Sequence, residues 1–217
     1  MTHRTRVKIC GITRAQDALL SEQLGADAIG FVFVRKSKRY VEPDVASAIS
    51  HTLAPFITRV GLFLDDAPDV IAAVLQQFPS MVPQFHGQET PAQCERLFEQ
   101  FGIPYIKAIG VGDGMPSKAM LNEFEHARAF LFDSNAPGQL GGTGHTFDWQ
   151  QLDDYAGKPL VLAGGLNPDN VADAIKQIQP YAVDVSSGVE ASKGIKNPAA
   201  MHDFFNAIHK ADNDLRG

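Results

Sequence analysis

The stretch Lys8-Ile9-Cys10-Gly11-Ile12-Thr13 joins a short apolar run to a helical pattern, and this pairing organises the whole chain. Val7–Ile9 is typical of a strand, and Thr13 with Gln16 has the spacing of a capping box at the start of a helix. Cys10 therefore lies where a strand ends and a helix begins, a position whose unpaired N–H groups favour a thiolate when the sulfur points at them. A buried structural thiol is the alternative for this residue.

The same unit recurs along the sequence, with no break that would mark a linker. The apolar runs cover residues 7–9, 28–33, 58–64, 81–86, 105–109, 129–132, 160–163 and 182–185. The helical patterns cover residues 13–24, 42–53, 66–78, 90–101, 117–126, 167–178 and 197–209, with a short segment at 147–149. Continuous apolar strands that alternate with helices predict a parallel sheet covered by helices.

This repetition predicts an α/β fold, a compact (β/α)8 TIM barrel in which residues 1–217 form a single domain. An open, doubly wound sheet is the alternative. Such a sheet usually carries a G-x-G-x-x-G turn after its first strand, and Cys10-Gly11-Ile12-Thr13 does not have that form.

The bulk composition excludes several classes of protein. A formal net charge of −6 argues against broad binding to nucleic acid or anionic membranes. Cys10 and Cys94 form no disulfide framework and no metal-spaced cluster, and Cys94 has the setting of a core residue. The charged N-terminus has no signal-peptide apolar region after it, and no apolar run approaches the roughly 20 residues that cross a bilayer. We therefore expect a cytoplasmic protein.

Polar residues gather at the expected C-terminal ends of the strands, where barrels of this type carry their chemistry. Because side chains alternate along a strand, Lys8 and Cys10 face the same way, and so do Asp184 and Ser186. An ammonium beside Cys10 would favour the thiolate. The alternative for Lys8 is a structural ion pair with a carboxylate such as Asp184.

Glycine and serine follow the last two strands. Gly164 and Gly165 end the seventh, and Ser186 and Ser187 end the eighth. Barrels often bind phosphate between these two loops, on backbone N–H groups that glycine allows an anion to approach. Two plain turns are the alternative, but both lie at the strands expected for a phosphate site.

Three further residues are candidates for the site. Asp133 ends an apolar strand, where a carboxyl group can serve as a general acid, although a loop carboxylate is the alternative. Arg39 belongs to a basic loop and can hold a carboxylate through two hydrogen bonds, unless the loop is a solvated face. His86 could bind substrate or act as an acid or base, or be a hydrogen-bonded histidine without such a role.

Taken together, these residues resemble phosphoribosylanthranilate isomerase of tryptophan biosynthesis. The resemblance spans essentially the whole chain. The matching motifs are Lys8–Thr13, Ser37–Val41, Gln84–Gly87, Asp133-Ser134, Gly141–Gly144 with Phe147–Trp149, Leu162–Leu166 and Val183–Glu190. Departures from the family pattern are Lys38, Phe85 and Asn197, and none of them is a residue assigned to chemistry.

The resemblance implies an aldose–ketose isomerase that carries out an Amadori rearrangement of N-(5-phosphoribosyl)anthranilate without metal or organic cofactor. Cys10 would be the general base and Asp133 the general acid. Arg39 would hold the anthranilate carboxylate, and Asp184 would contact a sugar hydroxyl or Lys8. Lys8 and His86 would also belong to the substrate-binding residues, and a small phosphorylated molecule would be the partner. We expect no nucleic-acid or membrane partner, and a monomer or homodimer. A different phosphosugar isomerase or epimerase, and a non-catalytic phosphosugar-binding barrel, are the alternatives.

Overall fold

Eight parallel strands close into a barrel. The computed structural model describes residues 4–112, 114–134 and 147–217, and the barrel strands follow one another around it in chain order. They are β1 (Arg6–Cys10), β2 (Ala28–Val32), β3 (Thr58–Phe63), β4 (Val82–Phe85), β5 (Tyr105–Gly110), β6 (Ala127–Asp133), β7 (Leu160–Leu162) and β8 (Ala182–Val185). Pairing of β1 with β8, which sets Lys8 opposite Asp184, completes the ring. The predicted (β/α)8 barrel is confirmed.

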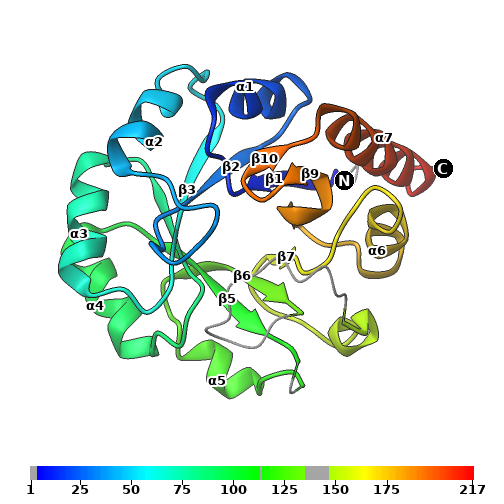
Figure 1. The fold of residues 1–217 in the computed structure, drawn as a ribbon. Coiled ribbons are helices and arrows are strands. Elements are labelled where there is room, and N and C mark those ends of the chain that lie inside the picture. The colour runs from blue at the N-terminus through cyan, green and yellow to red at the C-terminus, as the bar shows by residue number, and fades with distance from the viewer. Residues whose placement is uncertain (1–3, 113, 135–146) are drawn as a thin grey trace.

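Helices surround the strands on all sides (Figure 1). They are α1 (Ala15–Gln23), α2 (Pro43–Ser50), α3 (Pro68–Gln77), α4 (Pro91–Phe101), α5 (Lys118–Asn122), α6 (Val171–Ile178) and α7 (Pro198–Asp214), with a 3-10 helix η1 (Trp149–Leu152) between β6 and β7. The C-terminal helix α7 contacts both α6 and α1, so it covers the seam where the last strand meets the first. Among the described residues, no helix is both long and apolar enough to cross a bilayer.

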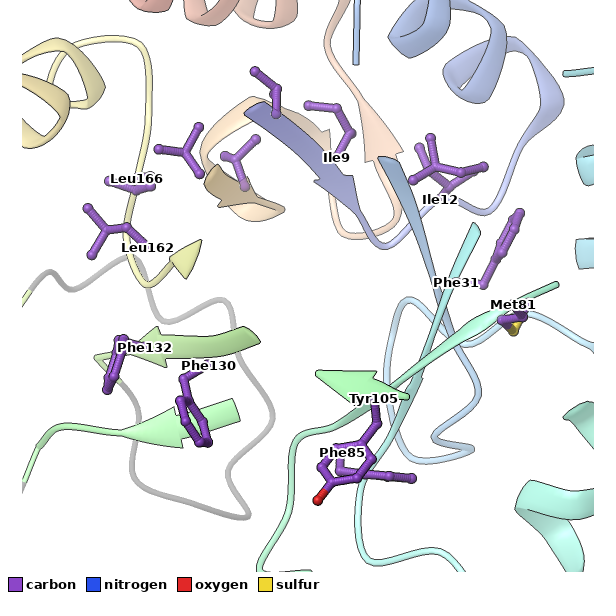
Figure 2. Packing of buried hydrophobic residues seen from close by; sticks show 14 of the residues in the cluster. Ile9, Ile12, Phe31, Met81, Phe85, Tyr105, Phe130, Phe132, Leu162 and Leu166 are labelled. Atoms are coloured by element: carbon purple, nitrogen blue, oxygen red, sulfur yellow. The ribbon is translucent and has the colours of Figure 1, made fainter. Parts of the chain in front are cut away.

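The alternation of side chains along each strand separates two kinds of packing. Large apolar residues point outward against the helices, and Figure 2 shows Phe130 and Phe132 on one face of β6. Removing such a ring from water stabilises the fold by roughly 1.5–3 kcal/mol. Smaller residues fill the interior beside β5 to β8, among them Ala108, Ala129 and Ala163. Small interior side chains leave room for polar groups near the mouth of the barrel.

The start of α1 differs from the expectation. The N-cap residue is Arg14, without a capping hydrogen bond from its side chain, so the capping box predicted at Thr13 is wrong. The Thr13 hydroxyl donates instead to the backbone carbonyl of Gly194. A capping box does form at Thr90 and Gln93, at the N-terminus of α4. The same pattern of threonine and glutamine therefore caps α4, whereas at α1 the threonine makes a tertiary contact instead.

Two other elements depart from the sequence pattern. A hairpin of β9 (Glu190–Ser192) and β10 (Ile195–Lys196) follows a 3-10 helix, η2 (Ser187–Val189), and none of these was expected. Gly194 has a φ of +82° in the hairpin turn, a value that glycine adopts without strain. Helix α5 ends at Asn122, short of the predicted end at residue 126, and Phe124, two residues beyond this end, is buried.

Candidate active site

A cavity opens at the C-terminal ends of the barrel strands, and its wall collects most of the predicted site residues. Cys10, Arg39, His86, Asp133, Gly164, Gly165, Asp184, Ser186 and Ser187 line it, together with apolar residues such as Val32 and Leu62. These residues come from strands and loops far apart in the sequence. The closed barrel brings them together because all eight strands run in the same direction.

Cys10 is the last residue of β1 and is buried, with only 5% of its surface exposed. Its neighbour in the register is Gly30 of β2, where an added Cβ would lie 2.9 Å from the thiol sulfur and 3.1 Å from Lys8 Cε. The absence of a side chain at Gly30 therefore makes room for both the thiol and the ammonium. This glycine was not singled out from the sequence.

Burial raises the pKa of the Cys10 thiol, because the thiolate loses its hydration. Lys8 and Lys196 act in the opposite direction, since their positive charges favour the thiolate, and Asp184 adds to the rise. The sequence-based expectation of a favoured thiolate is therefore wrong in its net direction, although the influence of Lys8 has the expected sign. A base in this position needs the two ammonium groups to offset its burial.

Lys8 lies one layer deeper in the barrel than Cys10. Its Nζ atom donates to Asp184 Oδ1 across 2.8 Å, and both side chains are nearly inaccessible. Burial disfavours the charged ammonium, but Asp184 and Cys10 together raise the pKa of Lys8. The ion pair that the sequence offered as the alternative for Lys8 is therefore present. Asp184 is among the residues that line the cavity, and Lys8 is not.

His86 and Asp133 form a second polar group in the cavity. Asp133 is the last residue of β6, and its Oδ2 lies 3.7 Å from His86 Nε2. His86 Nδ1 is 3.0 Å from Nε2 of Gln84, a fully buried amide inside the barrel. Burial lowers the pKa of His86, so the imidazole is held neutral next to the carboxyl group.

The two loops proposed for phosphate lie against one another. Gly164 and Gly165 have φ values of +80° and +66°, and a Cβ on Gly164 would lie 2.5 Å from the Ser134 nitrogen. A Cβ on Gly188 would lie 1.9 Å from the Leu166 carbonyl oxygen, so the loop after β8 touches the loop after β7. This contact places Ser186 and Ser187 on the same side of the cavity as the glycines.

Arg39 reaches the cavity from the loop after β2, and Glu190 holds it in place. Arg39 Nε and Nη2 donate to the two carboxylate oxygens of Glu190, each across 2.8 Å. Lys196 Nζ lies 3.0 Å from Glu190 Oε1 and donates to the Ser186 carbonyl oxygen. Arg39 is thus a buried, anchored part of the site, whereas Arg35, Lys36 and Lys38 of the same basic loop form an exposed face.

Comparison with known proteins gives the family. A family model described as N-(5'phosphoribosyl)anthranilate (PRA) isomerase matches residues 7–207. The chain belongs to the N-(5'-phosphoribosyl)anthranilate isomerase family. An isomerase of this name from Pseudomonas fluorescens (strain Pf0-1) is 49% identical over 203 residues, which are 94% of this chain and 98% of the relative.

Solved structures of family members share the fold. The phosphoribosyl anthranilate isomerase from Thermus thermophilus superposes with a TM-score of 0.84 at 36% identity, covering 95% of this chain and 99% of that one. A phosphoribosyl anthranilate isomerase in complex with reduced 1-(o-carboxyphenylamino)-1-deoxyribulose 5-phosphate gives a TM-score of 0.77 at 40% identity, with coverage of 95% and 99%. The family resemblance drawn from the sequence is confirmed.

Sequence reasoning missed four residues around this isomerase site: Gly30, Gln84, Glu190 and Lys196. Gln84 and Glu190 belong to motifs already matched to the isomerase family, so the motifs pointed to them without giving them a contact. Lys196 carried no local signal. The glycine loop Gly141–Gly144, which also supported the resemblance, lies outside the described residues.

Proposed function

We propose that this isomerase catalyses the Amadori rearrangement of N-(5-phosphoribosyl)anthranilate to 1-(2-carboxyphenylamino)-1-deoxyribulose 5-phosphate in tryptophan biosynthesis, with Cys10 as general base and Asp133 as general acid. The observation that carries the assignment is that Cys10 and Asp133, from β1 and β6, line one cavity. The relative solved with reduced 1-(o-carboxyphenylamino)-1-deoxyribulose 5-phosphate supports a ligand with a phosphate, a sugar chain and an aryl carboxylate.

The reaction begins with acid catalysis by Asp133. Its carboxyl group donates a proton to the furanose ring oxygen while the bond from that oxygen to C1 of the sugar breaks. The lone pair of the anthranilate nitrogen moves to C1 and forms a Schiff base. Ser134 Oγ, 3.4 Å from Asp133 Oδ1, and His86, kept neutral by burial, flank the carboxyl group and orient it.

The second stage is base catalysis by Cys10. The thiolate takes the proton from C2 of the sugar, and the electron pair forms a C1–C2 double bond and neutralises the nitrogen. The resulting enolamine transfers a proton from the C2 hydroxyl group to C1 and becomes the ketone. C1 is reduced and C2 is oxidised within one molecule, so the reaction balances without an outside oxidant or reductant. Lys8 and Lys196 favour the thiolate that this step needs.

The other cavity residues bind the substrate in this scheme. Arg39 holds the anthranilate carboxylate, and the loops of Gly164, Gly165, Ser186 and Ser187 hold the phosphate. Asp184, held in place by its ion pair with Lys8, accepts a hydrogen bond from a sugar hydroxyl group. His86 contacts the substrate beside Asp133.

We also propose that residues 1–217 act as one domain in the cytoplasm, as a monomer or homodimer. The single closed barrel, with its first strand paired to its last, supports one domain. A relative from Thermotoga maritima, described as a dimeric phosphoribosylanthranilate isomerase from which monomers were generated, supports either assembly. Sedimentation of the purified protein at several concentrations measures which one is present.

A fluorescence assay of substrate turnover tests the proposal. We expect the purified wild-type protein to be active in the presence of a chelator, and Cys10→Ala and Asp133→Asn each to lose about a hundredfold or more in kcat. Cys94→Ala is the matched control, because Cys94 is a buried thiol in α4 outside the cavity, and its activity should stay at the wild-type level.

Two results would contradict this assignment in different ways. Tight phosphosugar binding without turnover by the wild type would indicate a non-catalytic binding barrel. Full activity of Cys10→Ala would indicate a phosphosugar isomerase or epimerase that uses another base.

A further inference from the structure

Arg39 is fixed at both ends of its side chain. An added Cβ at Gly11 would lie 2.6 Å from Arg39 Cδ, so the arginine stem crosses directly over the turn that follows Cys10. The guanidinium head is held by the bidentate bonds to Glu190, and only 8% of the residue surface is exposed. A long side chain fixed in this way has lost its rotamer freedom before any ligand arrives.

Glu190 is itself fixed by groups from the β9–β10 hairpin. Lys196 Nζ lies 3.0 Å from Glu190 Oε1, and the Gly194 backbone N–H donates to the same oxygen across 3.3 Å. The side chain of Lys196 has no exposed surface, and that of Glu190 is 4% exposed. The hairpin therefore sets the orientation of the Glu190 carboxylate. This orientation in turn determines that the Nε and Nη2 edge of the Arg39 guanidinium bonds to Glu190.

The charges of this triad do not cancel. Arg39 and Lys196 carry two formal positive charges and Glu190 one formal negative charge, a formal net charge of +1 for these three side chains. Burying an excess charge is costly unless an opposite charge can approach it. Cys10 lies close enough for its thiolate form to interact favourably with Arg39 and Lys196. An anionic ligand group at the cavity end of Arg39 would offset the excess further.

We infer that Glu190 is a positioning residue that, fixed by Lys196, presents Arg39 to the carboxylate of the anthranilate ring, so that the β9–β10 hairpin determines specificity for the acidic end of the substrate. This inference rests on the proposed function and names the residues that set its carboxylate subsite. The hairpin also binds the Ser186 carbonyl through Lys196 Nζ across 3.0 Å, which ties the carboxylate end to the loop proposed for phosphate.

The test is the variant Glu190→Gln in the full-length protein, with two ligands that differ in one group. The first is reduced 1-(o-carboxyphenylamino)-1-deoxyribulose 5-phosphate, and the second is the same compound without the carboxyl group. We expect Glu190→Gln to bind the first about tenfold or more weakly, because losing the bidentate anchor of Arg39 outweighs the added positive charge, and to bind the second within about twofold of wild type. For turnover, KM should rise more than kcat falls.

Two further variants keep the test interpretable. Glu99→Gln, on the exposed face of α4, changes the same charge away from the cavity and should leave both affinities at the wild-type level. Glu190→Gln/Lys196→Met restores the net charge of +1 if the single variant folds poorly, and it should still bind the carboxylate ligand weakly because Arg39 lacks its anchor.

If Glu190→Gln bound both ligands more weakly to the same extent, the inference would be overturned. Glu190 would then have a structural role that acts through the phosphate loop. Unchanged affinity for both would overturn it as well. Failure of the proposed function has a different signature, since the wild-type protein itself would then not turn over the substrate or would not distinguish the two ligands.

Discussion

Lys8 Nζ and Asp184 Oδ1 lie 2.8 Å apart inside the barrel, at the seam where β1 pairs with β8. The two residues are direct neighbours in the strand register, although the chain between them makes up most of the barrel. Their ion pair places a positive charge below Cys10 and a fixed carboxylate at the cavity wall. Closure of the barrel and arrangement of the site therefore depend on the same contact.

Replacing Lys8 by Met should lower the stability of the fold and raise the pKa of the Cys10 thiol. We expect a loss of about 3–5 kcal/mol in the free energy of unfolding, because Asp184 would keep a buried charge without its partner. The positive charge of Lys8 lowers the pKa of Cys10, so its removal raises that pKa, and the acid limb of the kcat/KM profile moves to higher pH. Thiolate absorbance in a Cys94→Ala background measures the shift.

The double variant Lys8→Met/Asp184→Asn is the control for this prediction. It should recover part of the lost stability, since no charge is left unpaired, while keeping activity low. An unchanged thiol titration in Lys8→Met would remove Lys8 from any role in tuning Cys10, without affecting the role of Cys10 itself.

Adding a methyl group at Gly30 should disturb the Cys10 thiol, the proposed general base. The new Cβ would lie 2.9 Å from the Cys10 sulfur, so we expect Gly30→Ala to cost about 1–3 kcal/mol in stability and to reduce kcat strongly. Gly61→Ala is the matched control, because its Cβ would meet the flexible Met81 side chain on the outer face of the barrel. Gly61→Ala should lose some stability and retain its kcat, and comparable kcat for both variants would contradict the prediction.

Gly164 should be sensitive to substitution for two separate reasons. Its φ of +80° costs a non-glycine residue roughly 1–2 kcal/mol. A Cβ there would also lie 2.5 Å from the Ser134 nitrogen and push the loop out of place. We expect Gly164→Ala to raise KM about tenfold by weakening the hydrogen bonds to phosphate.

The control for Gly164 is Gly102→Ala at the end of α4. Gly102 has a φ of +64° and nothing within 4 Å of an added Cβ. An alanine at this position therefore introduces backbone strain without a steric clash. Gly102→Ala should lower the melting temperature and leave KM unchanged. A KM of wild-type size for Gly164→Ala would argue against a phosphate site at this loop.

His86 should make stability depend on pH. Burial lowers its pKa in the folded protein, so the unfolded chain binds a proton more readily, and the folded state loses stability as pH falls below the usual histidine range near 6.5. The slope contributed by this one residue reaches at most about 1.4 kcal/mol per pH unit.

Urea unfolding between pH 7 and pH 5 measures this dependence. His86→Gln should lose less stability over that range than the wild-type protein. His51→Gln, at an exposed position after α2, should follow the wild-type curve, and identical curves for His86→Gln and wild type would contradict the prediction.

The barrel, and the strand ends that line its cavity, could be predicted from the sequence, because both follow from local patterns. A strand buried on both faces must be apolar along its length, and alternation decides which side chains point inward, so Cys10, Asp133 and Asp184 could be placed at one end of the barrel. Glycine pairs and polar strand ends are equally local. Motif matches then connected these positions to one family.

Tertiary structure alone decided the contacts and the net electrostatics. Thr13 has the sequence of a helix cap, but its hydroxyl bonds to Gly194, and Arg39 is anchored by Glu190 from a hairpin that no pattern indicated. The pKa of Cys10 rises although a helix N-terminus and Lys8 suggested a fall, because the loss of hydration depends on every atom packed around the sulfur. The periodicity of the sequence indicates which way a side chain points. Its hydrogen-bond partners and the extent of its burial depend on residues that folding brings near.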